Sequence, residues 1–137
     1  MKLKNPVKEY RSEGGTVFSC QYHVVWCPKY RRNVLEGDVA DYLEQFILQM
    51  GQQMQYEVLD MEIQPDYVHL LLDVDPKPGI VSLVKKIKYQ SALALRTQFP
   101  ELKSRLPGLW TRNVFISTVG TADTSDIQNY LDEQKGK

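Results

Sequence analysis

The amino-acid sequence predicts an α+β fold of the ferredoxin-like (split βαβ) class, in which two helices cover one face of a four-stranded antiparallel sheet. Two observations predict this fold. Four strand-like segments and two segments of helical periodicity follow one another in the order strand, helix, strand, strand, helix, strand, and a short further helix ends the chain. The length of 137 residues suits one domain, expected over residues 1–137 with its core at about 16–134.

The first half of the chain predicts a strand, a helix and a hairpin. Residues 16–27 are β-branched, aromatic and aliphatic, and Pro28 ends this first strand. A helix is expected after Gly37 and Asp38, because apolar residues recur there at helical spacing. These residues are Val39, Leu43, Phe46, Ile47 and Met50. Residues 56–63 and 67–74 then predict two strands joined by a turn.

The second half repeats the pattern. A Pro- and Gly-containing break at 76–79 precedes a second helix, which begins near Ile80 and must end before Pro100. Residues 114–119 predict the fourth strand. Beyond it, Thr121 or Asp123 is expected to cap a final helix that runs to about residue 134.

Charge and cysteine usage narrow the function classes. Lysine plus arginine equals aspartate plus glutamate at 17 each, which argues against a non-specific nucleic-acid coat protein and leaves only local basic patches. No apolar run approaches the roughly 20 residues of a membrane span, and no export signal is visible, so we expect a cytoplasmic protein. Cys20 and Cys27 fall in one predicted strand and are expected to stay unpaired. The candidate patches are Lys2, Lys4, Lys8 and Arg11; Lys29, Tyr30, Arg31 and Arg32; and Lys85, Lys86 and Lys88.

Strand alternation places His69 and Asp73 on the sheet face away from the two helices, where a ligand can reach them. The alternative reading of such a histidine is a packed, hydrogen-bonded residue, and we expect that for His23 in the first strand. In the final helix, four residues at helical spacing form one stripe. Two of them are apolar, Ile127 and Leu131, and two have polar ends, Tyr130 and Gln134. This stripe is either a plain docking face or a way to bring a tyrosine hydroxyl and an amide near the histidine.

Such a grouping suits phosphodiester transfer, in which a tyrosine oxygen attacks phosphorus while a hard cation neutralises the charge on the phosphate. The sequence contains no Gly-rich phosphate loop, no Gly-x-Ser-x-Gly elbow and no paired-cysteine zinc pattern. Phosphodiester chemistry is therefore the reaction class with a visible candidate site.

Five stretches in this order resemble a known family, the single-tyrosine HUH transposases of bacterial and archaeal insertion sequences of the IS200 type, which move as single-stranded DNA. The resemblance runs from about residue 16 to residue 134. The stretches are 22–32 (YHVVWCPKYRR), 65–71 (PDYVHLL), 109–110 (LW), 115–120 (FISTVG) and 130–134 (YLDEQ).

The resemblance implies a mechanism and a set of partners. Tyr130 corresponds to the nucleophile that forms a 5′-phosphotyrosine, and His69 and Gln134 correspond to ligands of Mg²⁺ or Mn²⁺. Family members bind DNA hairpins as homodimers in which the terminal helix of one subunit can complete the site of the other, and Gly120 would be the hinge of that helix. The basic loop fits hairpin recognition because it combines phosphate-binding charge with a ring that can stack on a base. This loop is Lys29, Tyr30, Arg31 and Arg32.

One position departs from the family pattern: Tyr67 stands where the first histidine of the metal-binding pair is expected. A phenol is a poorer metal ligand than imidazole at neutral pH, so the resemblance implies weaker metal binding here. Two alternatives follow: a relative that binds DNA hairpins without cutting them, and a ferredoxin-like RNA-binding module. The RNA-binding module predicts exposed aromatic residues on the central strands for base stacking, and the sequence offers only Tyr67 there.

Overall fold

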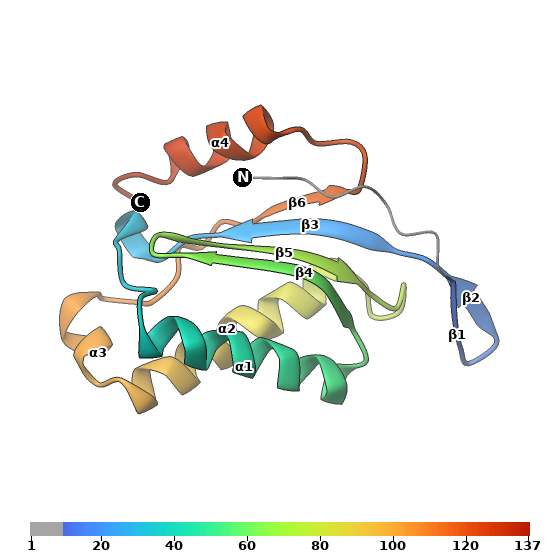
Figure 1. The fold of residues 1–137 in the computed structure, drawn as a ribbon, viewed down its shortest axis with the longest axis horizontal. Coiled ribbons are helices and arrows are strands. Elements are labelled where there is room, and N and C mark those ends of the chain that lie inside the picture. The colour runs from blue at the N-terminus through green and yellow to red at the C-terminus, as the bar shows by residue number, and fades with distance from the viewer. Residues whose placement is uncertain (1–9) are drawn as a thin grey trace.

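A computed structural model describes residues 10–137 of the chain (Figure 1). Lys2, Lys4 and Lys8 of the first basic patch lie outside the described residues. The elements are β1 (Arg11–Glu13), β2 (Thr16–Phe18), β3 (Gln21–Trp26), the 3-10 turn η1 (Lys29–Arg31), α1 (Asp38–Met54), β4 (Glu57–Gln64), β5 (Tyr67–Asp73), α2 (Ile80–Gln98), α3 (Glu101–Arg105), β6 (Phe115–Thr118) and α4 (Thr124–Glu133).

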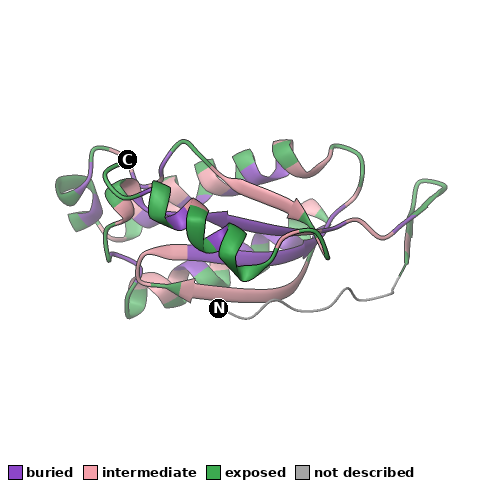
Figure 2. Cartoon of the chain, turned by 90° about the horizontal axis from the view of Figure 1, so that it is seen from above, coloured by how far each residue is buried: buried purple, intermediate pink, exposed green. Residues whose placement is uncertain are grey.

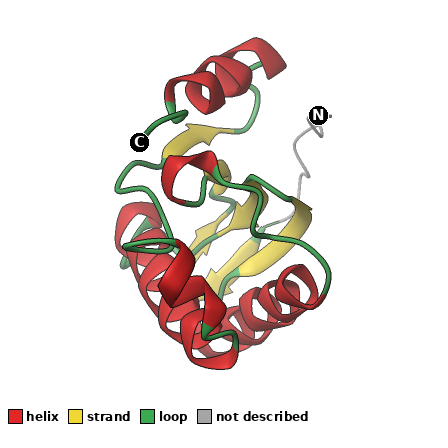
Figure 3. Ribbon diagram, turned by 90° about the vertical axis from the view of Figure 1, so that its left-hand side faces the viewer, coloured by secondary structure: helices red, strands yellow, loops and turns green. Residues whose placement is uncertain are grey.

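The sheet has the predicted ferredoxin-like topology. Its four strands run in the order β4-β5-β3-β6, and every neighbouring pair is antiparallel. Helices α1 and α2 lie under one face, while α4 lies over the other, on the side of β6 and β3 (Figures 1 and 3). The predicted fold class and the terminal helix are therefore confirmed.

The core lies between the sheet and helices α1 and α2. The residues of β3 and β5 that point toward these helices alternate with those that point toward α4, as the period of two requires. The helix-facing set is fully buried, and the two central strands are more buried than the edge strands (Figure 2). This set includes Val24 and Trp26 of β3 and Val68, Leu70 and Leu72 of β5.

Three segments differ from the prediction. The single strand expected at 16–27 is divided at residues 19–20 into β2 and β3. Strand β2 pairs with β1 across a turn at Gly14 and Gly15, both of which adopt positive φ. The segment between Pro100 and the fourth strand, where no helix was predicted, contains α3. The basic loop contains η1, in which Tyr30 and Arg31 have positive φ.

Two further expectations concern the cysteines and membrane-spanning helices. Cys20 and Cys27 are both free, as predicted. In the part of the chain from residue 10 onward, no helix has the length and apolar character needed to cross a bilayer.

Candidate active site beneath the terminal helix

Helix α4 is fixed over the sheet by its cap and by two apolar side chains. Asp123 caps the helix, with its carboxylate accepting from the Asp126 main-chain nitrogen at 3.0 Å while Asp126 binds back to the Asp123 nitrogen at 2.9 Å. Ile127 and Leu131 are buried in a cluster with Val25 of β3 and Cys27, the residue after that strand. The stripe predicted from the sequence is thus the docking face of the helix.

Tyr130 projects from this docking face and is partly buried. Its ring packs against Phe115 of β6, with the ring centroids 5.8 Å apart. The Tyr130 hydroxyl is buried and has no hydrogen-bond partner among the described residues. Burial raises the pKa of Tyr130 well above its ordinary value, and only the side chain of Thr111 acts in the opposite direction. The candidate nucleophile is therefore held neutral and away from solvent.

His69 is buried beside a second histidine, so the expectation that a ligand can reach it on an open face is wrong for this conformation. Its Nε2 lies 3.0 Å from Nδ1 of His23 in a hydrogen bond, and only 7% of the His69 surface is exposed. Burial, with a smaller effect of His23, lowers the pKa of His69 to about 4. His23 is a packed, hydrogen-bonded residue, as expected. Both imidazoles are thus neutral at pH 7.

Asp73 is also covered rather than open to ligands. It is 2% exposed, and a guanidinium nitrogen of Arg11 lies 3.4 Å from its carboxylate. Strand β1 supplies this arginine, and the sequence analysis had not predicted that strand. The carboxylate is therefore used for an internal ion pair.

Tyr67 and Glu62 are joined by a hydrogen bond from the phenol to the carboxylate. Glu62 lies on β4 directly opposite His69 in the β4–β5 register. Burial, followed by the bond to Glu62, raises the pKa of Tyr67. The residue that replaces the expected histidine is therefore a neutral donor bound to an acid next to His69.

Gln134 is buried at the end of α4 and contacts other groups than His69. Its Oε1 accepts a bond of 3.3 Å from Nδ2 of Asn113, and its Nε2 donates to the main-chain oxygen of Tyr130 at 3.3 Å. The amide thus connects the end of α4 to the segment that leads into β6.

The predicted metal ligands do not fit a shared ion in this arrangement. Tyr67 bonds to Glu62, His69 bonds to His23, and Gln134 bonds to Asn113, so each donor makes a separate contact. Across residues 10–137, no three side chains of histidine, cysteine, aspartate or glutamate form a group that could hold a metal. A neutral imidazole has the right chemistry for a ligand, but the donors do not converge.

The basic loop divides into one internal and three outer side chains. Arg31 donates to Asp66 at 2.8 Å and to the main-chain oxygen of Leu131 at 3.1 Å, and is only 13% exposed. Tyr30 and Arg32 are exposed, and the Lys29 ammonium lies 5.5 Å from the centre of the Tyr30 ring. In this conformation, Arg31 supports α4 and the other three face solvent at least in part.

Sequence reasoning missed the segment that supports Tyr130. Thr111 contacts Tyr130, and Asn113 contacts Gln134. The Lys88 ammonium donates to the main-chain oxygens of Thr111 and Asn113, at 2.7 and 2.9 Å. Strand alternation identifies Phe115, because the core-facing Ile116 follows it. Nothing in the sequence pattern marks Thr111 or Asn113.

Fold and site together define a class: a ferredoxin-like domain whose C-terminal helix lays a tyrosine over the sheet face that carries a central-strand histidine. Comparison with known proteins gives the family. The model of the family described as "Transposase IS200 like" matches residues 16–134. The chain belongs to the IS200-like transposase family, whose members serve the transposition of insertion sequences and hence DNA recombination.

Individual relatives agree with this. The chain is 39% identical over 131 residues to the ISDra2 transposase TnpA of Deinococcus radiodurans, covering 94% of each. It is 31% identical over 126 residues to the transposase for insertion sequence element IS200 of Salmonella typhimurium, covering 90% of this chain and 82% of the relative.

Two solved structures resemble this fold. A crystal structure of a chain assigned as a transposase, from Deinococcus radiodurans, has a TM-score of 0.84 at 34% identity, covering 93% of this chain and 99% of the other. A REP-associated tyrosine transposase bound to a REP hairpin has a TM-score of 0.57 at 16% identity, covering 92% of this chain and 69% of the other. The second likeness is evidence of the fold alone.

Proposed function

We propose that the protein cleaves and rejoins single-stranded DNA at hairpin-marked ends of a mobile element, through a 5′-phosphotyrosine formed by Tyr130. One observation carries the proposal: in a chain of the IS200-like transposase family, α4 presents a tyrosine on the sheet face that also carries His69. A phenol oxygen is a competent nucleophile toward phosphorus when a group removes its proton.

The reaction is a pair of transesterifications. The Tyr130 oxygen attacks the phosphorus in line, its proton leaves to a base or to solvent, and the bond to the 3′-oxygen breaks to leave a free 3′-hydroxyl. A 3′-hydroxyl of a second strand end then attacks the phosphotyrosine and releases Tyr130. The number of phosphodiester bonds is conserved, so no external energy source is required.

The described conformation is a resting one under this proposal. The Tyr130 hydroxyl is buried without a partner, so it cannot reach a DNA phosphate while α4 is docked. The connection to β6 contains Gly120 with φ of 92°, which gives the chain a point at which α4 can swing. Displacing α4 would expose Tyr130 and uncover the part of the sheet face around Val25 and Tyr67.

Metal dependence and dimer formation belong to the same proposal. Mg²⁺ or Mn²⁺ would neutralise phosphate charge, with His69 and Gln134 as expected donors. Because Tyr67, His69 and Gln134 do not converge here, we assign no step to the ion. A homodimer would allow α4 of one subunit to serve the other.

Hairpin binding is supported by the exposed members of the basic loop. Lys29, Tyr30 and Arg32 offer two charges and a ring for a folded strand. The same fold holds a REP hairpin in one solved structure, so the fold can accommodate such a ligand.

A second candidate function is hairpin binding without cleavage. The observation that favours it is Tyr67, whose phenol replaces the expected imidazole and bonds to Glu62. The two functions differ in one experiment, in which a hairpin-bearing strand with a 3′ extension is mixed with the protein and Mn²⁺. Covalent protein–DNA product on a denaturing gel supports the transposase; a mobility shift on a native gel without covalent product supports the binding protein.

A further inference from the structure

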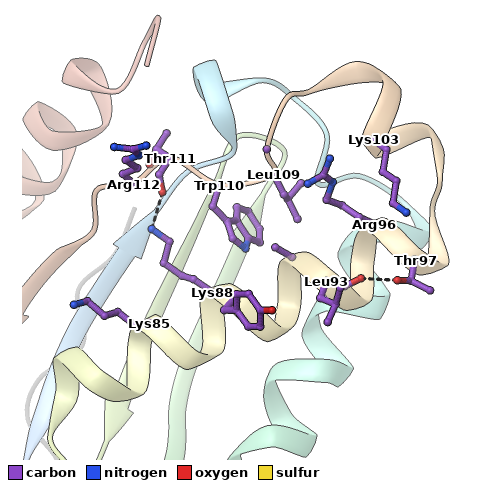
Figure 4. A pocket seen from close by; sticks show the side chains of 13 residues that line it. Lys85, Lys88, Leu93, Arg96, Thr97, Lys103, Leu109, Trp110, Thr111 and Arg112 are labelled. Carbon is purple, nitrogen blue, oxygen red and sulfur yellow. Dashed lines mark hydrogen bonds between the residues drawn. The ribbon is translucent and has the colours of Figure 1, made fainter.

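A basic pocket with two aromatic rings lies between α2 and the segment that follows α3 (Figure 4). Its volume is about 580 Å³. It lies on the helical side of the sheet and contains none of the residues proposed for catalysis. No aspartate or glutamate lines it. The residues that characterise it are Lys85, Tyr89, Arg96, Lys103, Trp110 and Arg112.

The cations of this pocket have no internal counter-charges. Among residues 10–137, the ion pairs involve Arg11 and Arg31, and none of the five basic residues that line the pocket takes part. The Nε of Arg96 is buried and lacks a hydrogen-bond partner in the same part of the chain. A buried guanidinium nitrogen without an acceptor is costly, and an anion bound beside the Arg96 guanidinium would offset part of that cost.

The two rings of the pocket differ in how firmly they are held. Trp110 points from its segment toward α2, donates its indole N–H to Ser91 at 3.1 Å and packs edge-on to Trp26 (Figure 4). Tyr89 is 68% exposed on α2, where it follows Lys85 by one helical turn. Proteins that bind single-stranded nucleic acid stack its bases on aromatic rings while basic side chains contact its phosphate backbone. The fixed ring of Trp110 and the exposed ring of Tyr89, placed among unpaired basic residues, fit this mode of binding.

One wall of the pocket continues to the candidate active site. Trp110 and Arg112 line the pocket, while Thr111 between them is the neighbour of the Tyr130 hydroxyl. Lys88 fixes this segment through its bonds to the main-chain oxygens of Thr111, which Figure 4 shows, and of Asn113. A strand held in the pocket would therefore lie against the segment that supports α4.

We propose that this pocket binds an unpaired stretch of the DNA substrate, with bases stacked on Tyr89 and Trp110 and phosphates held by Arg96, Arg112 and their neighbours. The inference rests on the proposed function, because it assumes a single-stranded DNA substrate. An unpaired base is favoured over duplex because a ring can stack only on an exposed base face, and the volume is within the range of small-ligand pockets.

The test measures binding of an unstructured fluorescent oligothymidylate to the full chain by anisotropy. Tyr89→Ala removes an exposed ring, and Arg112→Glu reverses an exposed charge. Each is expected to weaken binding by about tenfold. The matched control is Lys86→Glu, since Lys86 is an exposed lysine on the same helix that lines a different pocket with Phe46 and Gln90. It is expected to change affinity by less than about threefold, the effect of net charge alone.

Cross-linking adds a positional readout. An oligonucleotide that carries 5-iodouracil should cross-link on irradiation to the peptide containing Tyr89 or to that containing Trp110. Unchanged affinity in both pocket variants, or cross-links only to the α4 face of the sheet, would overturn the proposal. Equal weakening of a blunt hairpin without any unpaired flank would also overturn it, because the pocket would then contact duplex.

The test of the pocket is independent of the test of DNA cleavage. Cleavage is read from the Tyr130-dependent covalent product, which does not depend on the anisotropy measurement. If the covalent product forms while Tyr89→Ala and Arg112→Glu bind the oligonucleotide normally, only the pocket proposal fails. If the pocket variants lose binding while no covalent product forms, only the cleavage proposal fails.

Discussion

Arg31 donates a hydrogen bond of 3.1 Å from Nη1 to the main-chain oxygen of Leu131, which joins the basic loop to the helix that carries Tyr130. Its Nε bonds at the same time to Asp66 in the turn before β5, at 2.8 Å. A guanidinium can do this because its donors are arranged in a planar fork. This side chain therefore adds a polar link between α4 and the turn before β5 to the apolar docking of Ile127 and Leu131.

Replacing Arg31 by alanine should loosen α4. The change removes charge-assisted bonds of a largely buried group and leaves Asp66 without its partner, so we expect α4 docking to weaken by about 1 to 3 kcal/mol. Hydrogen–deuterium exchange of residues 124–133 should accelerate accordingly. Arg32→Ala is the control, since Arg32 is an exposed neighbour. Equal exchange of α4 in the wild type and Arg31→Ala would contradict this role.

Several parts of this arrangement follow from the sequence. Hydrophobic periodicity gives the order of elements, and the two predicted cap candidates, Thr121 and Asp123, include the observed cap of α4, Asp123. Alternation along β5 correctly puts His69 on the face opposite α1 and α2. These features depend on neighbours within a few residues, which is why the sequence reports them.

Other parts depend on contacts between distant segments. The sequence predicts that Arg31 binds DNA, because it lies in a basic loop. Its observed partner, Leu131, lies 100 residues away along the chain, so local patterns do not reveal the contact. The same reason hides the burial of His69, which bonds to His23 on a strand distant in the sequence, and the bonds from Lys88 to the segment at 111–113. The β1 strand was missed because three residues carry little periodicity.

Lys88 should give the protein a specific dependence on alkaline pH. Burial lowers the pKa of Lys88 to about 8 in the folded state. The unfolded chain keeps the ordinary value of about 10.4 and so binds more protons between these two pKa values. Stability conferred at this site therefore rises as pH increases through that window.

The Lys88→Met variant isolates this effect. Relative to Lys88→Met, the wild type should gain about 1 kcal/mol in free energy of unfolding between about pH 8 and pH 9.5, a figure reduced for partial exposure of the ammonium. Urea unfolding at each pH measures it. Lys86→Met serves as the matched control and should show no such trend. A wild-type advantage that is constant or falls over this range would mean that Lys88 is not desolvated.

Changing Tyr67 to histidine should strengthen divalent-metal binding. The substitution breaks the bond to Glu62 and places a second imidazole two residues from His69 on the same face of β5, which is the spacing that the family resemblance implies for a metal-binding pair. We expect Mn²⁺ affinity to rise about tenfold, measured by calorimetry. Tyr67→Phe removes the phenol without adding a ligand and should not raise it. No gain in Tyr67→His would mean that position 67 does not limit metal binding.

The central claim is that Tyr130 becomes covalently linked to DNA. The most direct measurement is to incubate the protein with a hairpin-bearing single strand and Mn²⁺, digest the product and identify the modified peptide by mass spectrometry. We predict a 5′-phosphate link on Tyr130, a released strand with a free 3′-hydroxyl, and loss of both in Tyr130→Phe. A link on another residue, or cleavage that persists in Tyr130→Phe, would contradict the account.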